Sequence, residues 1–142
     1  MKKFTRCILL IVAVVPGIVS CAVPDDEFEH KECAIRAIYV SPPGNSSAPQ
    51  VTGQITVDPS TGDASVVFAI PRDYPARYGY RPDDLTVRAT LTYDVFITPG
   101  LEGRKDLSRE DKPYTVTVSN RTTGESHEYT LFAYVSTISS GS

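Results

Sequence analysis

The stretch LTVRATLTYDV (residues 85–95) decides the fold class of this chain. Its apolar side chains fall at every second position, namely Leu85, Val87, Ala89, Leu91, Tyr93 and Val95. Successive side chains of an extended strand point to opposite sides, so a period of two gathers these residues on one face. The stretch therefore predicts a half-buried β-strand.

The same period returns in both directions along the chain. Alternating runs cover residues 35–40, 51–57, 66–70, 114–119 and 129–135. Turn-forming residues separate them, including a link that ends on Gly124, which can adopt a positive φ. The proline-rich segment 41–49 lacks the donors of a central strand and is expected to cross over at the surface. No segment shows the spacing of an amphipathic helix over three turns.

These runs predict an all-β fold. Six to seven short strands in about one hundred residues favour a single two-sheet sandwich of immunoglobulin-like (Ig-like) form over a closed barrel. The sandwich is expected to span residues 34–138 and to be followed by a disordered tail, residues 139–142.

The first twenty residues have the pattern of a bacterial export signal. A basic start (MKKFTR) precedes an apolar run that is shorter than the roughly 20 residues a membrane span needs. The tetrad IVSC (residues 18–21) resembles a lipobox, which predicts a lipoprotein signal peptide over residues 1–20 and lipidation of Cys21. Several acyl chains would hold the protein on a membrane stably. The alternative is ordinary signal-peptidase cleavage after Ala22.

Residues 21–33 are expected to form a flexible acidic tether. Asp25, Asp26 and Glu27 look like the surface-export signal that Bacteroidota lipoproteins carry behind the lipidated cysteine. That resemblance implies a lipid-anchored protein on the outer face of the outer membrane; a periplasmic or secreted protein is the alternative. A plain solvated linker would explain the same charges.

Charge and cysteine content narrow the function classes. Loss of the signal removes three of 14 basic residues and none of 17 acidic ones, which moves the net charge from −3 to about −6. Nucleic-acid binding needs a basic footprint, so nucleic acid is not an expected partner. Cys33 is left single, and we expect a small buried hydrophobe rather than a reactive thiol.

Catalytic and metal-binding patterns are missing from the sequence. His30 and His127 are too few and too scattered for a metal site or a Ser/His/Asp arrangement. The sequence shows no nucleophile elbow, no phosphate-binding loop and no Cys-x-x-Cys pair. We therefore expect a non-enzymatic protein without cofactor or metal. An enzyme such as a small hydrolase would need a buried acid or base that the sequence does not reveal.

One segment, RDYPARYGYRP (residues 72–82), has the composition of a binding loop. Tyrosine and arginine dominate interface hot spots because they bury much area at little entropic cost. The predicted binding residues are Arg72, Tyr74, Arg77, Tyr78, Tyr80 and Arg81. As alternatives, one or two of the tyrosines plug an open end of the sandwich, and the arginines only screen neighbouring aspartates.

A family resemblance covers roughly residues 35–135. The segments IRAIYV (35–40), TGQI (52–55), VVFAIP (66–71) and PYTVTV (113–118) carry it, with Gly124 and the last strand. They are similar to Ig-like or cadherin-like β domains of unknown function in Bacteroidota surface lipoproteins, many of which are encoded near glycan-uptake systems. That family has no established active-site motif, so it implies no functional residues.

Together these observations predict a monomeric, non-enzymatic, lipid-anchored protein of the cell envelope. Its expected role is accessory binding or scaffolding at the outer surface, with a glycan or a surface protein as partner. The alternatives are a glycan-capture protein of a polysaccharide uptake system, for which tyrosines offer stacking platforms, and an adhesin or pilus-associated module.

Overall fold

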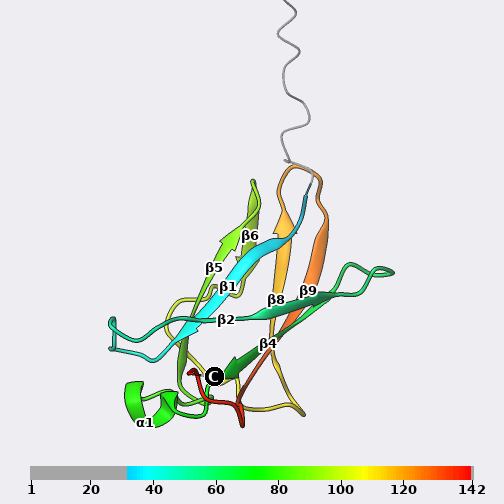
Figure 1. Ribbon diagram of the computed structural model, residues 1–142. Helices are drawn as coiled ribbons and strands as arrows, with labels where there is room; N and C mark the ends of the chain where they lie inside the picture. Colours follow the sequence, from blue (N-terminus) through cyan, green and yellow to red (C-terminus); the bar gives the residue numbers. More distant parts are fainter. Residues whose placement is uncertain (1–31, 142) are drawn as a thin grey trace, which may run out of the picture.

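The computed structural model describes residues 32–141. The predicted signal peptide, Cys21 and the acidic residues Asp25, Asp26 and Glu27 lie outside the described residues. Within them the chain forms two packed β-sheets, as Figure 1 shows. The prediction of an all-β, two-sheet sandwich is confirmed.

We call the two sheets A and B. Sheet A has the order β2-β1-β5-β7 and sheet B the order β3-β4-β9-β8-β6. The strands are β1 (Ile35–Ser41), β2 (Val51–Thr52), β3 (Gln54–Val57), β4 (Ala64–Ile70), β5 (Leu85–Leu91), β6 (Val95–Thr98), β7 (Arg104–Lys105), β8 (Tyr114–Asn120) and β9 (Ser126–Val135). Neighbouring strands are antiparallel except β4 and β9, which pair in parallel over the full length of β4.

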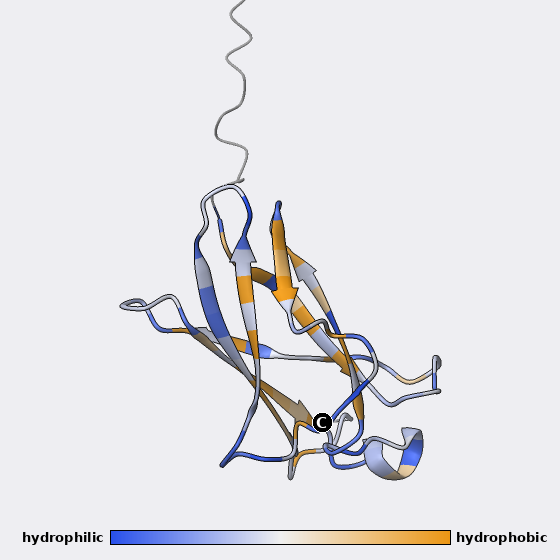
Figure 2. Ribbon diagram, turned by 180° about the vertical axis from the view of Figure 1, so that it is seen from behind, coloured by the Kyte–Doolittle hydropathy of each residue, from blue (hydrophilic) through white to orange (hydrophobic). Residues whose placement is uncertain are grey.

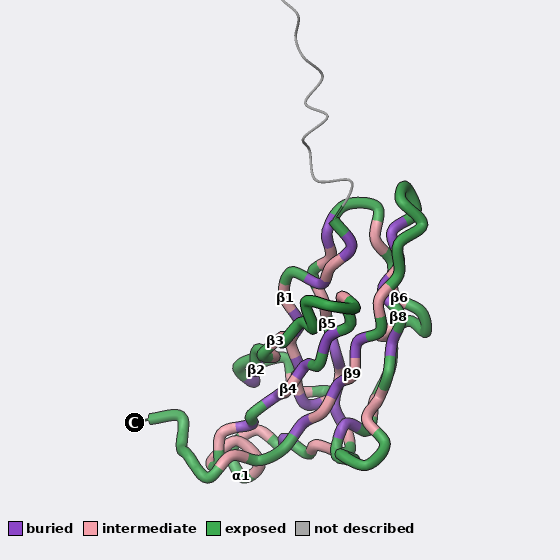
Figure 3. The backbone as a smooth tube through the Cα atoms, turned by 90° about the vertical axis from the view of Figure 1, so that its right-hand side faces the viewer, coloured by how far each residue is buried: buried purple, intermediate pink, exposed green. Residues whose placement is uncertain are grey.

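The core lies between the sheets and follows the alternation of the sequence. Sheet A contributes Ile38 and Leu85, and sheet B contributes Phe68 and Leu131, all fully buried. Hydrophobic residues concentrate in the strands and hydrophilic ones in the hairpin loops (Figure 2), and buried residues occupy the strand centres (Figure 3). Along most of the strands, the period of two therefore marks the buried face.

The run predicted over residues 51–57 is split by Gly53. Before it β2 belongs to sheet A, and after it β3 belongs to sheet B. The Gly53 N–H donates to the Ile38 carbonyl at 2.8 Å. A Cβ at this position would lie 2.6 to 2.9 Å from Val66, Phe68 and Ile38. The chain crosses between the sheets so close to the core that only glycine fits.

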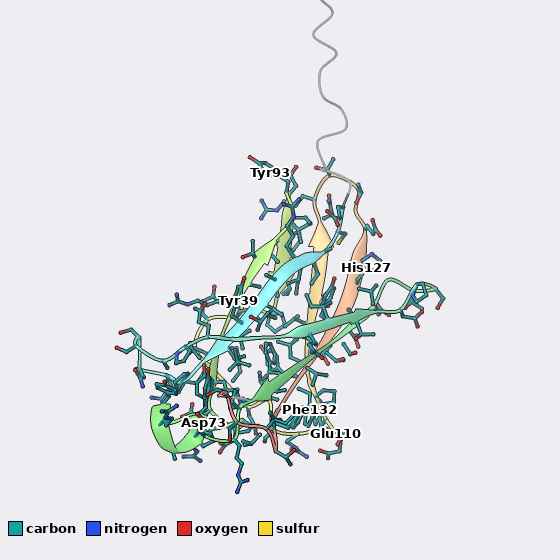
Figure 4. All side chains as sticks on the ribbon, in the orientation of Figure 1. Tyr39, Asp73, Tyr93, Glu110, His127 and Phe132 are labelled. Atoms are coloured by element: carbon teal, nitrogen blue, oxygen red, sulfur yellow. The ribbon has the colours of Figure 1, made fainter. Side chains whose placement is uncertain are left out.

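The run over residues 85–95 is also split, which corrects the prediction of one long strand. β5 ends at Leu91, and the chain turns at Asp94, which has a φ of 57°. Aspartate adopts this left-handed conformation more readily than most residues. β6 then continues in sheet B. Tyr93, expected on the apolar face, lies at the tip of this turn and is 71% exposed (Figure 4).

Thr92, expected on the polar face, is buried where the described chain begins. Its hydroxyl lies within hydrogen-bonding distance of two backbone carbonyls, that of Glu32 at 2.9 Å and that of Ala34 at 3.1 Å. Cys33 is also buried, and its Sγ lies 3.4 Å from the Val118 carbonyl. Cys33, placed in the tether by the sequence analysis, therefore packs in the domain as a buried hydrophobe.

The C-terminal segment, expected to be disordered, is hydrogen bonded at least as far as Ser140. Its backbone N–H and hydroxyl donate to the Asp73 carboxylate at 2.9 and 2.8 Å. The Ile138 carbonyl accepts from the Arg72 N–H at 3.0 Å. These hydrogen bonds attach the C-terminal segment to Arg72 and Asp73, which follow β4. No helix within residues 32–141 is long and apolar enough to cross a membrane.

Candidate functional site

The predicted Tyr/Arg binding loop contains a short helix, α1 (Tyr74–Tyr78). Pro75 suits the first turn because its φ is fixed and its missing N–H is not needed there. Gly79 ends the helix with a φ of 78°, and its N–H donates to the Pro75 carbonyl at 3.1 Å. Asp73 beside α1 and Tyr93 lie at opposite ends of the sandwich (Figure 4).

Tyr74 packs against the other two tyrosines of this loop. The Tyr74 ring centroid lies 5.1 Å from that of Tyr78 and 5.3 Å from that of Tyr80. Tyr80 is only 1% exposed, and its hydroxyl donates to the carbonyls of Val40 and Pro49. Burial, with a smaller contribution from Tyr74, raises the pKa of Tyr80 to about 12. Tyr80 therefore matches the alternative reading: it plugs the end of the sandwich.

Two of the loop's arginines face the chain's own acids. Arg77 lies 3.1 Å from the Asp73 carboxylate, and Arg81 lies 2.8 Å from that of Asp83. Such exposed pairs contribute little to stability, and they match the screening alternative for these two residues. Arg72 is exposed, while Tyr74 and Tyr78 are half-buried against the core. The structure thus groups all six predicted residues, but several have structural roles.

Asp73 is the most perturbed carboxylate of this loop. Hydrogen bonds from the Ser140 N–H and hydroxyl, followed by a weaker one from Arg77, lower its pKa from 3.8 to about 2. These bonds favour the charged form of the carboxylate. Asp73 therefore acts as an anchor for the C-terminal segment.

A different feature, which the sequence analysis missed, lies on one side of the sandwich. β5 pairs with β1 along its length, but with β7 only at Leu85 and Thr86. Within residues 32–141, the edge of β5 from Val87 to Leu91 has no partner strand. β6 pairs with β8 alone and is the edge strand of sheet B. Both sheets therefore end with an open edge on this side.

Between these edges lies a groove of about 680 Å³, which we call the β5–β6 groove. Its lining includes inward-facing apolar residues of both strands and of the following loop: Val87, Ala89, Leu91, Val95, Ile97 and Leu101. Five of the six, all except Val87, are only half-buried although they pack against the core. The apolar interior of the sandwich is thus partly open here.

The hydrogen bonds of β1 show which backbone groups of β5 face the groove. The Ile38 carbonyl accepts from Gly53 and the Val40 carbonyl from Tyr80, so neither bonds to β5. In antiparallel pairing, the residue opposite such a position also points its N–H and C=O away from its partner. The opposite residues are Ala89 and Val87. The backbone groups of both residues therefore point away from β1, and those of Ala89 face the groove.

Charged side chains stand at the rim of the groove. Arg88 is exposed on the outer face of β5, next to the groove. Arg104 at the start of β7 lies 3.4 Å from the Asp84 carboxylate, and the Lys105 ammonium donates to the Glu102 carbonyl at 2.7 Å. Among the residues that line the groove, Arg88 is thus the one base and Glu102 the one acid.

A second surface feature is an aromatic pair on the outer face of sheet B. The rings of Phe132 and Tyr134 in β9 are stacked, with centroids 6.1 Å apart and planes 18° from parallel. Val67 and Ala69 of β4 are their register neighbours. Tyr134 is 42% exposed. This face offers an aromatic platform, and none of these four residues carries a charge.

The side chain of His127, at the start of β9, is 14% exposed and lies beside the β3–β4 hairpin. Its Nε2 is 2.5 Å from a Glu125 carboxylate oxygen, and its ring fills the space beside Gly62.

Cys33 is not placed as a reactive thiol. Burial raises the pKa of its thiol, and Glu125 adds to the effect. A raised pKa does not favour the reactive thiolate form. Within residues 32–141, no three His, Cys, Asp or Glu side chains are grouped so that they could hold a metal ion.

The chain is similar to two solved structures of Bacteroides proteins. No protein-family model matches the chain, and no curated protein matches it. Among solved structures, a "putative secreted protein" from Bacteroides fragilis aligns with 75% of this chain and 98% of its own, at 16% identity and a TM-score of 0.49. A DUF4623 family protein from Bacteroides eggerthii aligns with 70% of this chain at 15% identity and a TM-score of 0.36, and the match spans 21% of that longer protein.

Proposed function

We propose that this protein is a non-enzymatic, lipid-anchored binding module of the cell envelope, and that it binds a partner protein through the β5–β6 groove. One observation carries the proposal. The groove exposes half-buried apolar residues that alternation directs into the core, between two sheet edges that lack partner strands among residues 32–141. Open edges are sites where proteins recruit other chains.

The size and lining of the groove support a binding role. Ligand sites are concave, mainly apolar and of roughly 300–1,000 Å³, with few polar groups to set orientation. The β5–β6 groove, at about 680 Å³, falls within that range. Phe96, at its rim, is 37% exposed beneath the Arg121 guanidinium, and such aromatic residues anchor interfaces.

The binding proposal is tested with short random peptides selected on the purified protein. Peptides that bind are mapped by backbone NMR shifts. We expect perturbed resonances in β5 and β6. Phe96→Ala should bind more weakly, whereas Val57→Ala, which changes a more exposed apolar residue on the far edge strand of sheet B, should bind like the wild type. Selection that yields no peptide, or peptides that map elsewhere, would contradict the proposal.

The lipid anchor is tested separately by fatty-acid labelling in cells. Labelled fatty acid should enter the wild type and not Cys21→Ala. Replacing Asp25, Asp26 and Glu27 by Ala should leave the label in place and abolish protease access in whole cells. Equal membrane release with and without Cys21 would refute lipidation, and unchanged access would reduce the acidic run to a linker.

Glycan capture is a second candidate, favoured by the Phe132–Tyr134 platform. Aromatic faces can stack on apolar faces of sugar rings, and the neutral neighbours Val67 and Ala69 suit an uncharged glycan. Calorimetric titration with neutral polysaccharides should show binding that Tyr134→Ala removes. Binding that persists in Tyr134→Ala, or that is absent in the wild type, would refute this role.

A further inference from the structure

Among residues 32–141, the β5–β6 groove has the form of a sandwich that lacks one strand. Val95 and Ile97 of sheet B face inward, yet they stay half-buried. β7 occupies the position beside β5 only at Leu85 and Thr86. A strand that continued this position beside Val87–Leu91 would complete sheet A and cover the inward face of β6.

The backbone of β5 is oriented to receive such a strand. Ala89 points its N–H and C=O groups toward the groove, because its partner Ile38 is engaged on the other side of β1. Val87 points the same way, but it follows the Thr86–Arg104 pair, so its N–H faces β7. Exposed main-chain donors and acceptors in this pattern are what an added strand pairs with.

We propose that the groove takes up an extended segment of a partner protein as an added strand beside β5. This inference rests on the proposed function and specifies its binding mode. The open edge of five residues, Val87 to Leu91, is about 16 Å long at 3.3 Å per residue. A segment of similar length can therefore complete sheet A.

The surroundings define the chemistry of that segment. Residues placed opposite Val87 and Ala89 would share their inward face and meet Val95 and Ile97, so they must be apolar. The residue between them would lie opposite Arg88 on the outer face, where a carboxylate gains a cross-strand ion pair. The partner segment is thus apolar at alternate positions and acidic between them.

The experiment uses the peptides selected on the purified protein. The sequences that bind at the groove should alternate apolar and polar residues, with Asp or Glu enriched at the position between two apolar ones. Each of the best peptides is then made in two N-methylated forms, one methylated at amides that face β5 and one at amides that face solvent. We expect the first form to bind about tenfold more weakly or worse, because it loses main-chain hydrogen bonds, and the second to bind like the parent.

Two protein variants give an independent readout. Ala89→Pro removes a groove-facing N–H at an edge where proline is tolerated, so it should bind the parent peptide at least about tenfold more weakly. Thr90→Ala, on the outer face, should bind normally. If Ala89→Pro does not fold, the N-methylated peptides still decide the question.

The outcomes separate the two proposals. Equal binding of both N-methylated forms, or selected peptides without alternation, overturns strand addition and leaves groove binding intact. Failure to select any peptide that maps to β5 and β6 overturns both. Sedimentation experiments show whether the protein forms a dimer. If such a dimer protects the amides of β5 and no longer binds the peptides, the added strand comes from a second copy of this chain and a separate partner is overturned.

Discussion

Replacing Gly53 by alanine tests how the chain crosses between the sheets. The new Cβ would lie 2.6 Å from Val66 Cγ1, 2.7 Å from Phe68 Cε1 and 2.9 Å from Ile38 Cγ2. All three neighbours are fully buried, so none can move aside into solvent. The conformation of Gly53 is not the obstacle, since its φ lies outside the left-handed region.

The expected cost follows from this crowding. Overpacking of a well-packed core costs about 1–3 kcal/mol. For a domain of this size, each kcal/mol lowers Tm by about 4–8 °C, so Gly53→Ala should lower Tm by roughly 4–24 °C. The hydrogen bond from Gly53 to Ile38 holds β2 and the crossing in place, so a shifted backbone would also weaken that bond.

Thermal unfolding followed by circular dichroism measures the effect. Gly141→Ala is the matched control, because a Cβ there meets nothing within 4 Å and its φ is not in the left-handed region. That variant should unfold like the wild type. A Gly53→Ala variant that unfolds at the same temperature as Gly141→Ala would show that the chain does not pass this close to the core.

Two further predictions concern groups with shifted pKa values. Tyr80→Phe should lower the free energy of unfolding by about 1–3 kcal/mol, because the Val40 and Pro49 carbonyls lose a buried donor; an unchanged denaturant midpoint would argue against the plug. The Asp73 carboxylate, with a folded-state pKa of about 2, stabilises the fold above pH 4 and loses that effect as the pH falls toward 2. In Ser140→Ala, the pKa of Asp73 measured by NMR titration should rise toward 3.8, because the Ser140 hydroxyl no longer donates to the carboxylate. An unchanged pKa would mean that the C-terminal segment is not docked on Asp73.

Much of the fold could be predicted from the sequence because alternation reports burial directly. Seven strands of four residues or more are present among residues 32–141, within the expected six to seven. The breaks at Gly53 and Asp94 could not be predicted from alternation. Both sheets share one interior, so a chain that crosses from sheet A to sheet B keeps its apolar side inward, and the period continues through the crossing.

The candidate sites were less predictable, for reasons of tertiary contact. Composition marks the Tyr/Arg loop, but it cannot distinguish Tyr80, which reaches two core-side carbonyls, from Tyr74 and Tyr78, which remain half-buried. The β5–β6 groove exists because β7 is short and β6 lies in the other sheet. No local pattern in residues 85–98 reveals which strand edges lack partners, since pairing depends on segments far away in the sequence.

Hydrogen exchange at the amides of β5 tests the central claim most directly. If the edge is open, the Ala89 amide, which faces the groove, should exchange much faster than the Arg88 and Thr90 amides, which bond to β1. Amides along β4, which is paired on both sides, give the protected reference. We expect the Ala89 amide of the monomer to exchange faster than the amides of both its neighbours; uniform protection of Arg88 through Thr90 would contradict an open edge.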